Sequence, residues 1–224
     1  MTNDRAGPIA LISGAILSIL VFAFHPSHVV EQPVLGPFTL SQLVHGTALL
    51  GVPLLAYGLW QLGEWLGLDK AAPRLAVVLS LLAAAATVNA AVISNFVTPA
   101  AAKMSMMGHA APPHAAAPQA APAGHGSAPR MTMPPLVSVA VATNRGFAQV
   151  HVAFLSLALL LFALAIRSRN ALLGWSGVAV GIGPVLWQLS GQFAPSTHTM
   201  PLVIFPQALW MIAAGTVMLR RSSD

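Results

Sequence analysis

Long apolar stretches dominate the pattern of hydrophobic and polar positions along the chain. Six of them emerge, and each is long enough to cross a bilayer as a helix, which takes roughly 20 residues. They cover about 8–24, 40–62, 74–97, 135–166, 171–193 and 199–219. No strand-like alternation competes with this helical interpretation. The pattern therefore predicts an all-α, polytopic membrane protein with six transmembrane helices in one bundle.

The ends of these stretches divide the chain into three parts. Thr39 and Gln42 fit a capping box at the start of the second helix. We expect the third helix to stop at Pro99, and the fourth to be longer than the hydrocarbon core at 1.5 Å per residue. The predicted parts are helices one to three in residues 1–100, an outward-facing loop in 101–134, and helices four to six in 135–224.

Composition agrees with a membrane protein. Hydrophobic residues make up 56% of the chain and charged residues only 7%, whereas a soluble domain carries about 25% charged residues. The basic residues are scattered at predicted helix ends rather than clustered, which argues against a nucleic-acid partner. Cysteine is absent, which excludes disulfides and thiolate metal sites. The partner that composition indicates is the lipid bilayer.

The distribution of basic residues predicts an orientation. If the N-terminus is inside, seven of the ten Lys and Arg residues fall on the inner side. These seven are Arg5, Lys70, Arg74, Arg167, Arg169, Arg220 and Arg221, and the outer three are Lys103, Arg130 and Arg145. The positive-inside rule then predicts cytoplasmic termini. In a bacterial inner membrane the 101–134 loop would face the periplasm.

Polar side chains gather toward the predicted outer side. All eight histidines lie there, and the amides do so as well. The amides of this predicted polar pocket are Asn89, Asn95, Asn144, Gln149, Gln188, Gln192 and Gln207. Polar groups are costly in a bilayer and usually face the bundle interior or a wet cavity, so we expect a pocket that opens outward. The alternative is that these groups only join helices through hydrogen bonds.

The predicted loop is rich in possible metal ligands. Residues 103–133 contain three histidines and five methionines among alanine and proline. Thioether and imidazole together favour Cu(I), and imidazoles also bind Cu(II) or Zn(II). These short tracts resemble the Met/His-rich segments of periplasmic copper-handling proteins, a likeness that covers about thirty residues and identifies no family. The alternative is a disordered Ala/Pro linker with incidental histidine.

These observations lead to one functional prediction and two alternatives. The prediction is a non-enzymatic inner-membrane protein whose outward site binds or relays a copper-like ion. The predicted metal ligands are His25, His28, His45, His151 and His198, with Met104, Met106, Met107 and His109 in the loop. One alternative is a redox protein with haem b between His45 and His151. The other is a structural or assembly partner of a membrane or periplasmic protein.

No carboxylate lies within a predicted span, which argues against a proton pump or an acid–base enzyme.

Overall fold

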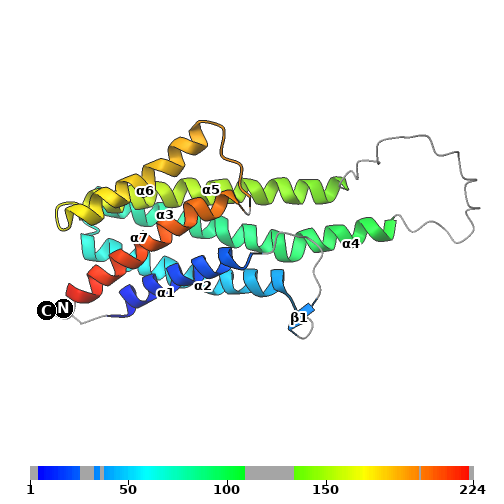
Figure 1. Cartoon of the computed structure of the whole chain (residues 1–224), viewed down its shortest axis with the longest axis horizontal. Coiled ribbons are helices and arrows are strands. Elements are labelled where there is room, and N and C mark those ends of the chain that lie inside the picture. The colour runs from blue at the N-terminus through cyan, green and yellow to red at the C-terminus, as the bar shows by residue number, and fades with distance from the viewer. Residues whose placement is uncertain (1–4, 26–32, 36–37, 109–133, 197, 222–224) are drawn as a thin grey trace, which may run out of the picture.

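The computed structural model describes residues 5–25, 33–35, 38–108, 134–196 and 198–221. Its elements are α1 (Ala6–Ala23), β1 (Pro33–Leu35), β2 (Phe38–Thr39), α2 (Leu40–Leu66), α3 (Ala71–Val92), the π-helical turn η1 (Ile93–Val97), α4 (Thr98–Gly108), α5 (Pro135–Ile166), α6 (Ala171–Leu189) and α7 (Thr199–Arg221). The segments α3, η1 and α4 form one continuous rod (Figure 1). Counted this way, the described residues contain six helical rods that are long and apolar enough to cross a membrane.

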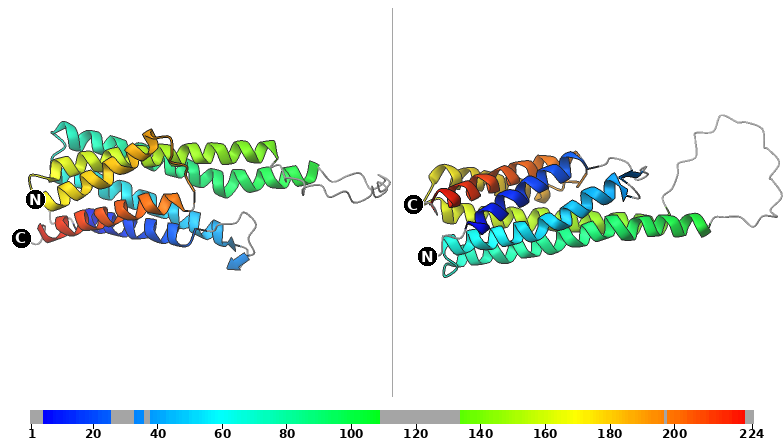
Figure 2. Two further views of the ribbon diagram at one scale, coloured as in Figure 1. Left: turned by 45° about the horizontal axis from the view of Figure 1, so that its top comes forward. Right: turned by 90° about the horizontal axis from the view of Figure 1, so that it is seen from below.

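The rods pack in a ring. Helix α1 packs between α2 and α7, and α5 packs between α3 and α6. The ring closes where α2 meets α3 and where α6 meets α7. The fully buried side chains at its centre include Leu11, Leu62, Leu159, Phe162 and Met211. Helix α1 begins and helix α7 ends at one end of this bundle, and the α2–α3 and α5–α6 turns lie at that same end (Figures 1 and 2). We call it the terminal end, and the other the loop end.

Two rods extend beyond the others at the loop end. These are α5 and the α3–η1–α4 rod, which run side by side past the ends of α1 and α2 (Figure 2). The bounds of α5 match the prediction, including its excess length. The segment 109–133, for which we predicted disorder, lies outside the described residues.

The third helix does not stop at Pro99, contrary to our expectation. It continues to Gly108, so the first residues of the predicted 101–134 loop are helical. A proline inside an α-helix lacks an N–H group and collides with the carbonyl group four residues earlier. The preceding turn is a π-helix, in which Thr98 donates its backbone N–H to Ile93 five residues earlier. This wider turn lets the helix pass Pro99 without ending.

The start of α2 follows the predicted capping box. The backbone N–H of Gln42 donates to Thr39 Oγ1 at 3.3 Å, and Thr39 N–H donates to Gln42 Oε1 at 3.0 Å. Just before it, β1 and β2 form a small antiparallel pair that we did not predict. Strands of two or three residues are too short to produce a readable alternation of polar and apolar positions.

Candidate functional site

Two of the predicted ligands, His25 and His45, lie together at the loop end. His25 follows the end of α1, and His45 lies in the second turn of α2. Their ring centroids are 5.1 Å apart, with the ring planes at 73°. Phe22 stacks on His25, with the two ring centroids 6.3 Å apart. Both imidazoles are half-buried.

The hydrogen bonds of His45 fix which of its nitrogens carries the proton. Its Nδ1 lies 2.8 Å from the backbone carbonyl oxygen of Ser41 and 3.3 Å from the Ser41 hydroxyl. A carbonyl oxygen can only accept, so Nδ1–H is the donor in the shorter bond. In a neutral ring, Nε2 then keeps its lone pair. Metal-binding histidines are commonly oriented in this way, with one ring nitrogen donating to a carbonyl group and the other free to bind the ion.

His151 has a different environment. It projects from α5 toward α3, where its Nδ1 lies 2.7 Å from Thr87 Oγ1 and 3.2 Å from the Ala83 carbonyl oxygen. Thr87 Oγ1 itself donates to Ala83 O at 3.0 Å. The imidazole therefore links α5 to α3, as a hydrogen-bonded polar group does between membrane helices.

The structure does not bring His45 and His151 into a common site. Leu66 at the end of α2 follows His45 by 21 residues, and Ile166 at the end of α5 follows His151 by 15. Measured along its own helix at 1.5 Å per residue, His45 is thus about 9 Å farther from the final residue of α2 than His151 is from that of α5. Within the part of the chain that the structure describes, no three His, Asp or Glu side chains are grouped to hold a metal ion.

Those of the other predicted ligands that the structure describes are spread over the loop end. His198 is exposed beside the start of α7, where its backbone N–H donates to Ser196 Oγ at 3.3 Å. Met104 is exposed on α4, which also contains Met106 and Met107. His28 and His109 lie outside the described residues, as do His114 and His125.

Two of the predicted amide side chains bond to a neighbouring helix. Gln207 on α7 is fully buried, and its Nε2 donates to Ser156 Oγ on α5 at 2.8 Å. Gln188 Nε2 on α6 donates to the backbone oxygen of Gln149 on α5 at 3.2 Å. Asn89 is exposed and donates to Ala85 O within its own helix.

Three of the amide groups have a carbonyl oxygen that is buried without a hydrogen-bond partner among the described residues. They belong to Asn95, Asn144 and Gln207. Asn95 lies in η1 and Asn144 in α5, which pack against each other. Gln192 is exposed beyond the end of α6.

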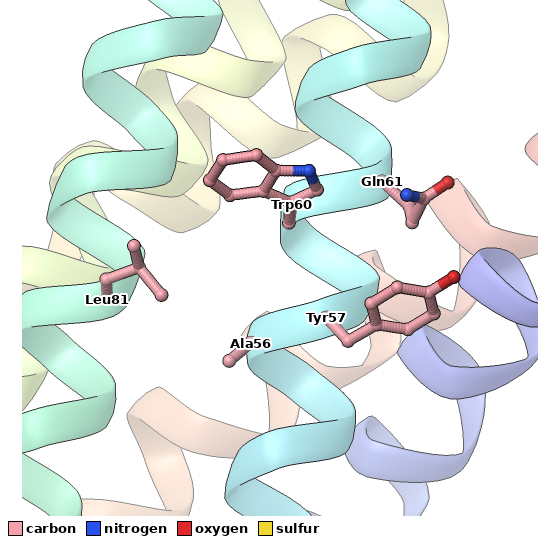
Figure 3. Close-up of a pocket in the computed structure, with 5 residues that line it drawn as sticks. All are labelled: Ala56, Tyr57, Trp60, Gln61 and Leu81. Carbon is pink, nitrogen blue, oxygen red and sulfur yellow. The ribbon is translucent and has the colours of Figure 1, made fainter.

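Among the described residues, two shallow grooves can be outlined that contain no predicted site residue. The larger, of about 320 Å³, lies along α2 and reaches Leu81 of α3 (Figure 3). It is lined by Ala56, Tyr57, Trp60, Gln61 and Leu81. The smaller, of about 150 Å³, is lined by Ile93, Val97, Leu136, Val139, Ala140 and Thr143.

Among the described residues at the loop end, the His25–His45 pair is thus the best candidate for a metal-binding site. The sequence predicted that the two histidines lie at the same end of the bundle, but not that they are in contact. Both residues stood near the ends of neighbouring predicted helices, which placed them at one membrane face. Their direct contact depends on the rotation of α2 about its axis, which the sequence does not show.

No protein-family model matches the chain, and neither a curated protein nor a solved structure does.

Proposed function

We propose that the protein is a non-enzymatic, multi-pass protein of the bacterial inner membrane that binds a copper-like metal ion at His25 and His45. The observation that carries this proposal is the His25–His45 pair, in which Ser41 orients one imidazole with Nε2 available as a ligand. Six apolar rods support the membrane location.

The spacing of the two rings suits a shared ion. A metal–imidazole bond is about 2.0–2.1 Å long, so each ring centroid lies about 3 Å from the ion and two rings on a tetrahedral ion have centroids about 5 Å apart. The observed separation is 5.1 Å. This spacing therefore matches that of two imidazole ligands on one ion.

The neighbouring sequence favours copper over harder ions. Thioether sulfur selects Cu(I), whereas carboxylate oxygen suits Mg²⁺ and Ca²⁺. The described acidic residues Glu64 and Asp69 lie at the terminal end, far along the bundle from the histidine pair. We propose that the Met/His-rich stretch 103–133 collects the ion and that the histidine pair receives it; this role rests on the composition of that stretch.

A second candidate is a structural or assembly partner that binds no ligand. It is favoured by the way His151 bonds to Thr87 and Gln207 bonds to Ser156, because both polar groups serve to join helices. The haem alternative needs His45 and His151 on one haem, whereas His45 contacts His25 of the first loop and His151 bonds to Thr87 of α3.

Metal content and affinity test the proposal. Protein purified without a histidine tag should bind Cu(I) in a competition assay with a chromogenic chelator. The affinity should fall as the pH is lowered, because protons compete with the metal for imidazole nitrogen. His25→Ala and His45→Ala should each weaken binding by at least about tenfold, in the range seen when the support of a metal site is damaged.

Two other histidines provide matched controls. His198→Ala removes an exposed imidazole at the loop end, and His151→Ala removes one bonded to another helix. Both variants should keep the affinity of the wild type. Unchanged copper binding in the His25→Ala/His45→Ala double variant, or no binding by the wild type, would favour the assembly-partner candidate instead.

A further inference from the structure

At the terminal end of the bundle, two arginines meet one tryptophan. Trp65 lies near the end of α2, Arg169 in the α5–α6 turn and Arg221 at the end of α7. The guanidinium carbon of Arg169 lies 4.8 Å from the Trp65 ring centroid, and that of Arg221 lies 5.7 Å from it. Segments far apart in sequence thus bring two positive charges to the same aromatic ring.

Hydrogen bonds to backbone oxygens hold both side chains in place. Arg169 Nη1 donates to the carbonyl oxygen of Trp65 at 2.7 Å, and Arg221 Nη2 donates to that of Arg169 at 3.4 Å. The two guanidinium carbons are therefore at most about 10.5 Å apart, the sum of their distances to the ring. Two positive charges within this distance together attract an anion that lies between them.

No carboxylate among the described residues neutralises this pair. Glu64, next to Trp65 in the chain, instead accepts hydrogen bonds from Trp60 Nε1 at 2.9 Å and Gln61 Nε2 at 2.7 Å. A guanidinium group has five N–H donors. The hydrogen bonds described above occupy one donor of Arg169 and one of Arg221. Both side chains are exposed, so most of their donors point to the surroundings of the protein.

We propose that Arg169, Arg221 and Trp65 form a binding site for the phosphate of an anionic phospholipid. The planar guanidinium group matches the oxygens of a phosphate, and Trp is enriched at the interface between the hydrocarbon and the headgroups. Arg167 adds a third charge nearby along the chain, with its guanidinium carbon 5.0 Å from the ring centroid of Trp175.

Exposed apolar side chains that follow Arg169 in the chain favour a phospholipid over free phosphate as the ligand. Leu172 and Trp175, in the first turns of α6, are 83% and 58% exposed. An apolar surface beside a cationic site fits the acyl chains of a phospholipid, which an inorganic phosphate ion lacks. The lipid assignment requires that the bundle is inserted in a membrane. It depends neither on the metal proposal nor on which end of the bundle faces the cytoplasm.

Native mass spectrometry of the full-length protein in detergent would measure the preference. Dioleoyl phosphatidylglycerol should bind more tightly than dioleoyl phosphatidylcholine, and equimolar inorganic phosphate should not displace it. Arg169→Gln/Arg221→Gln should weaken phosphatidylglycerol binding by about tenfold or more, because hydrogen bonds to a charged group are lost. Displacement by inorganic phosphate would identify a free-anion site and overturn the lipid assignment.

The matched control removes two other positive charges from the same end. Lys70→Gln/Arg220→Gln changes the net charge equally and leaves the Trp65 contacts intact, so it should weaken binding much less. Equal losses in the two double variants would overturn the proposal. If the Arg169→Gln/Arg221→Gln variant does not fold, Arg169→Lys/Arg221→Lys provides the test, since it keeps both charges and loses the forked geometry. If this lysine variant bound phosphatidylglycerol as tightly as the wild type does, the proposed site would be contradicted.

Discussion

Gln207 shows how a single polar side chain can set the alignment of two helices. It is fully buried on α7, and its amide nitrogen donates to Ser156 Oγ on α5 while its amide oxygen has no partner among the described residues. Hydrogen bonds between membrane helices contribute on average only about 0.6 kcal/mol. A buried polar group without a partner costs about 1–3 kcal/mol. The pair therefore adds little net stability, and its main effect is to favour one alignment of α5 against α7.

This balance predicts an unequal response to two substitutions. Ser156→Ala leaves the amide nitrogen of Gln207 unpaired and should lower the free energy of unfolding by about 1–3 kcal/mol. Gln207→Leu removes the donor and the unpaired oxygen together, and the Ser156 hydroxyl that it leaves can bond to a carbonyl group of its own helix, so the loss should be smaller. The Ser156→Ala/Gln207→Leu double variant should be more stable than Ser156→Ala alone. Unfolding in detergent, followed by circular dichroism, would measure all three. A Gln207→Leu variant less stable than Ser156→Ala would contradict this account.

The histidines show which residue-level features can be predicted from sequence. Hydropathy places His25 and His45 near helix ends at one face, and the structure has them there. The sequence did not indicate that His45 would pair with His25 while His151 would bond to Thr87. Partner choice depends on the rotation and tilt of each helix, and helices that are apolar on nearly every side carry little periodicity from which to infer them.

At the level of elements, glycine determines how closely α6 packs. A Cβ atom added at Gly177 would collide with Trp210 Nε1 and would lie 2.6 Å from Ala163 Cβ. The indole N–H of Trp210 also donates to the carbonyl oxygen of Leu173 at 2.9 Å, which joins α7 to α6. Small residues at such positions let membrane helices approach closely and gain van der Waals contact.

Gly177→Ala should therefore separate α6 from its neighbours. Overpacking a close interface costs about 1–3 kcal/mol, and we expect a loss of that size in the free energy of unfolding. Gly183→Ala is the matched control, because nothing lies within 4 Å of the added Cβ in the same helix. This control should be neutral or more stable, since alanine favours a helix over glycine by up to about 1 kcal/mol. Equal destabilisation by both substitutions would show that the close contact at Gly177 is unimportant.

The α3–η1–α4 rod marks the limit of prediction for an element. The sequence indicates the apolar span, and Pro99 is a reasonable place to end it. The helix continues because of a local change in hydrogen bonding from the α to the π pattern. No residue type encodes such a change reliably, so the length of this rod could not be predicted.

For the whole molecule, the six-rod bundle follows directly from hydropathy, whereas the order of packing around the ring does not. The seven basic residues assigned to one side do lie by helix ends and turns at the terminal end of the bundle. Lys103 and Arg145 instead lie on the two rods that extend at the loop end. The structure thus separates the charges along the bundle axis, and this separation is the physical basis for the orientation that we propose.

Accessibility of single cysteines tests that orientation directly. The chain has no cysteine, so each variant carries only the introduced thiol. Ser127→Cys lies in the segment between α4 and α5, outside the described residues, and Ser168→Cys lies in the exposed turn between α5 and α6. With cytoplasmic termini, an impermeant maleimide should label Ser127→Cys in intact spheroplasts and Ser168→Cys only after lysis. The opposite pattern would place the histidine pair and the Met/His-rich stretch in the cytoplasm. Capture of a periplasmic ion would then be excluded, while the lipid site at Trp65 would keep its predicted preference, because phospholipid headgroups are present in both leaflets.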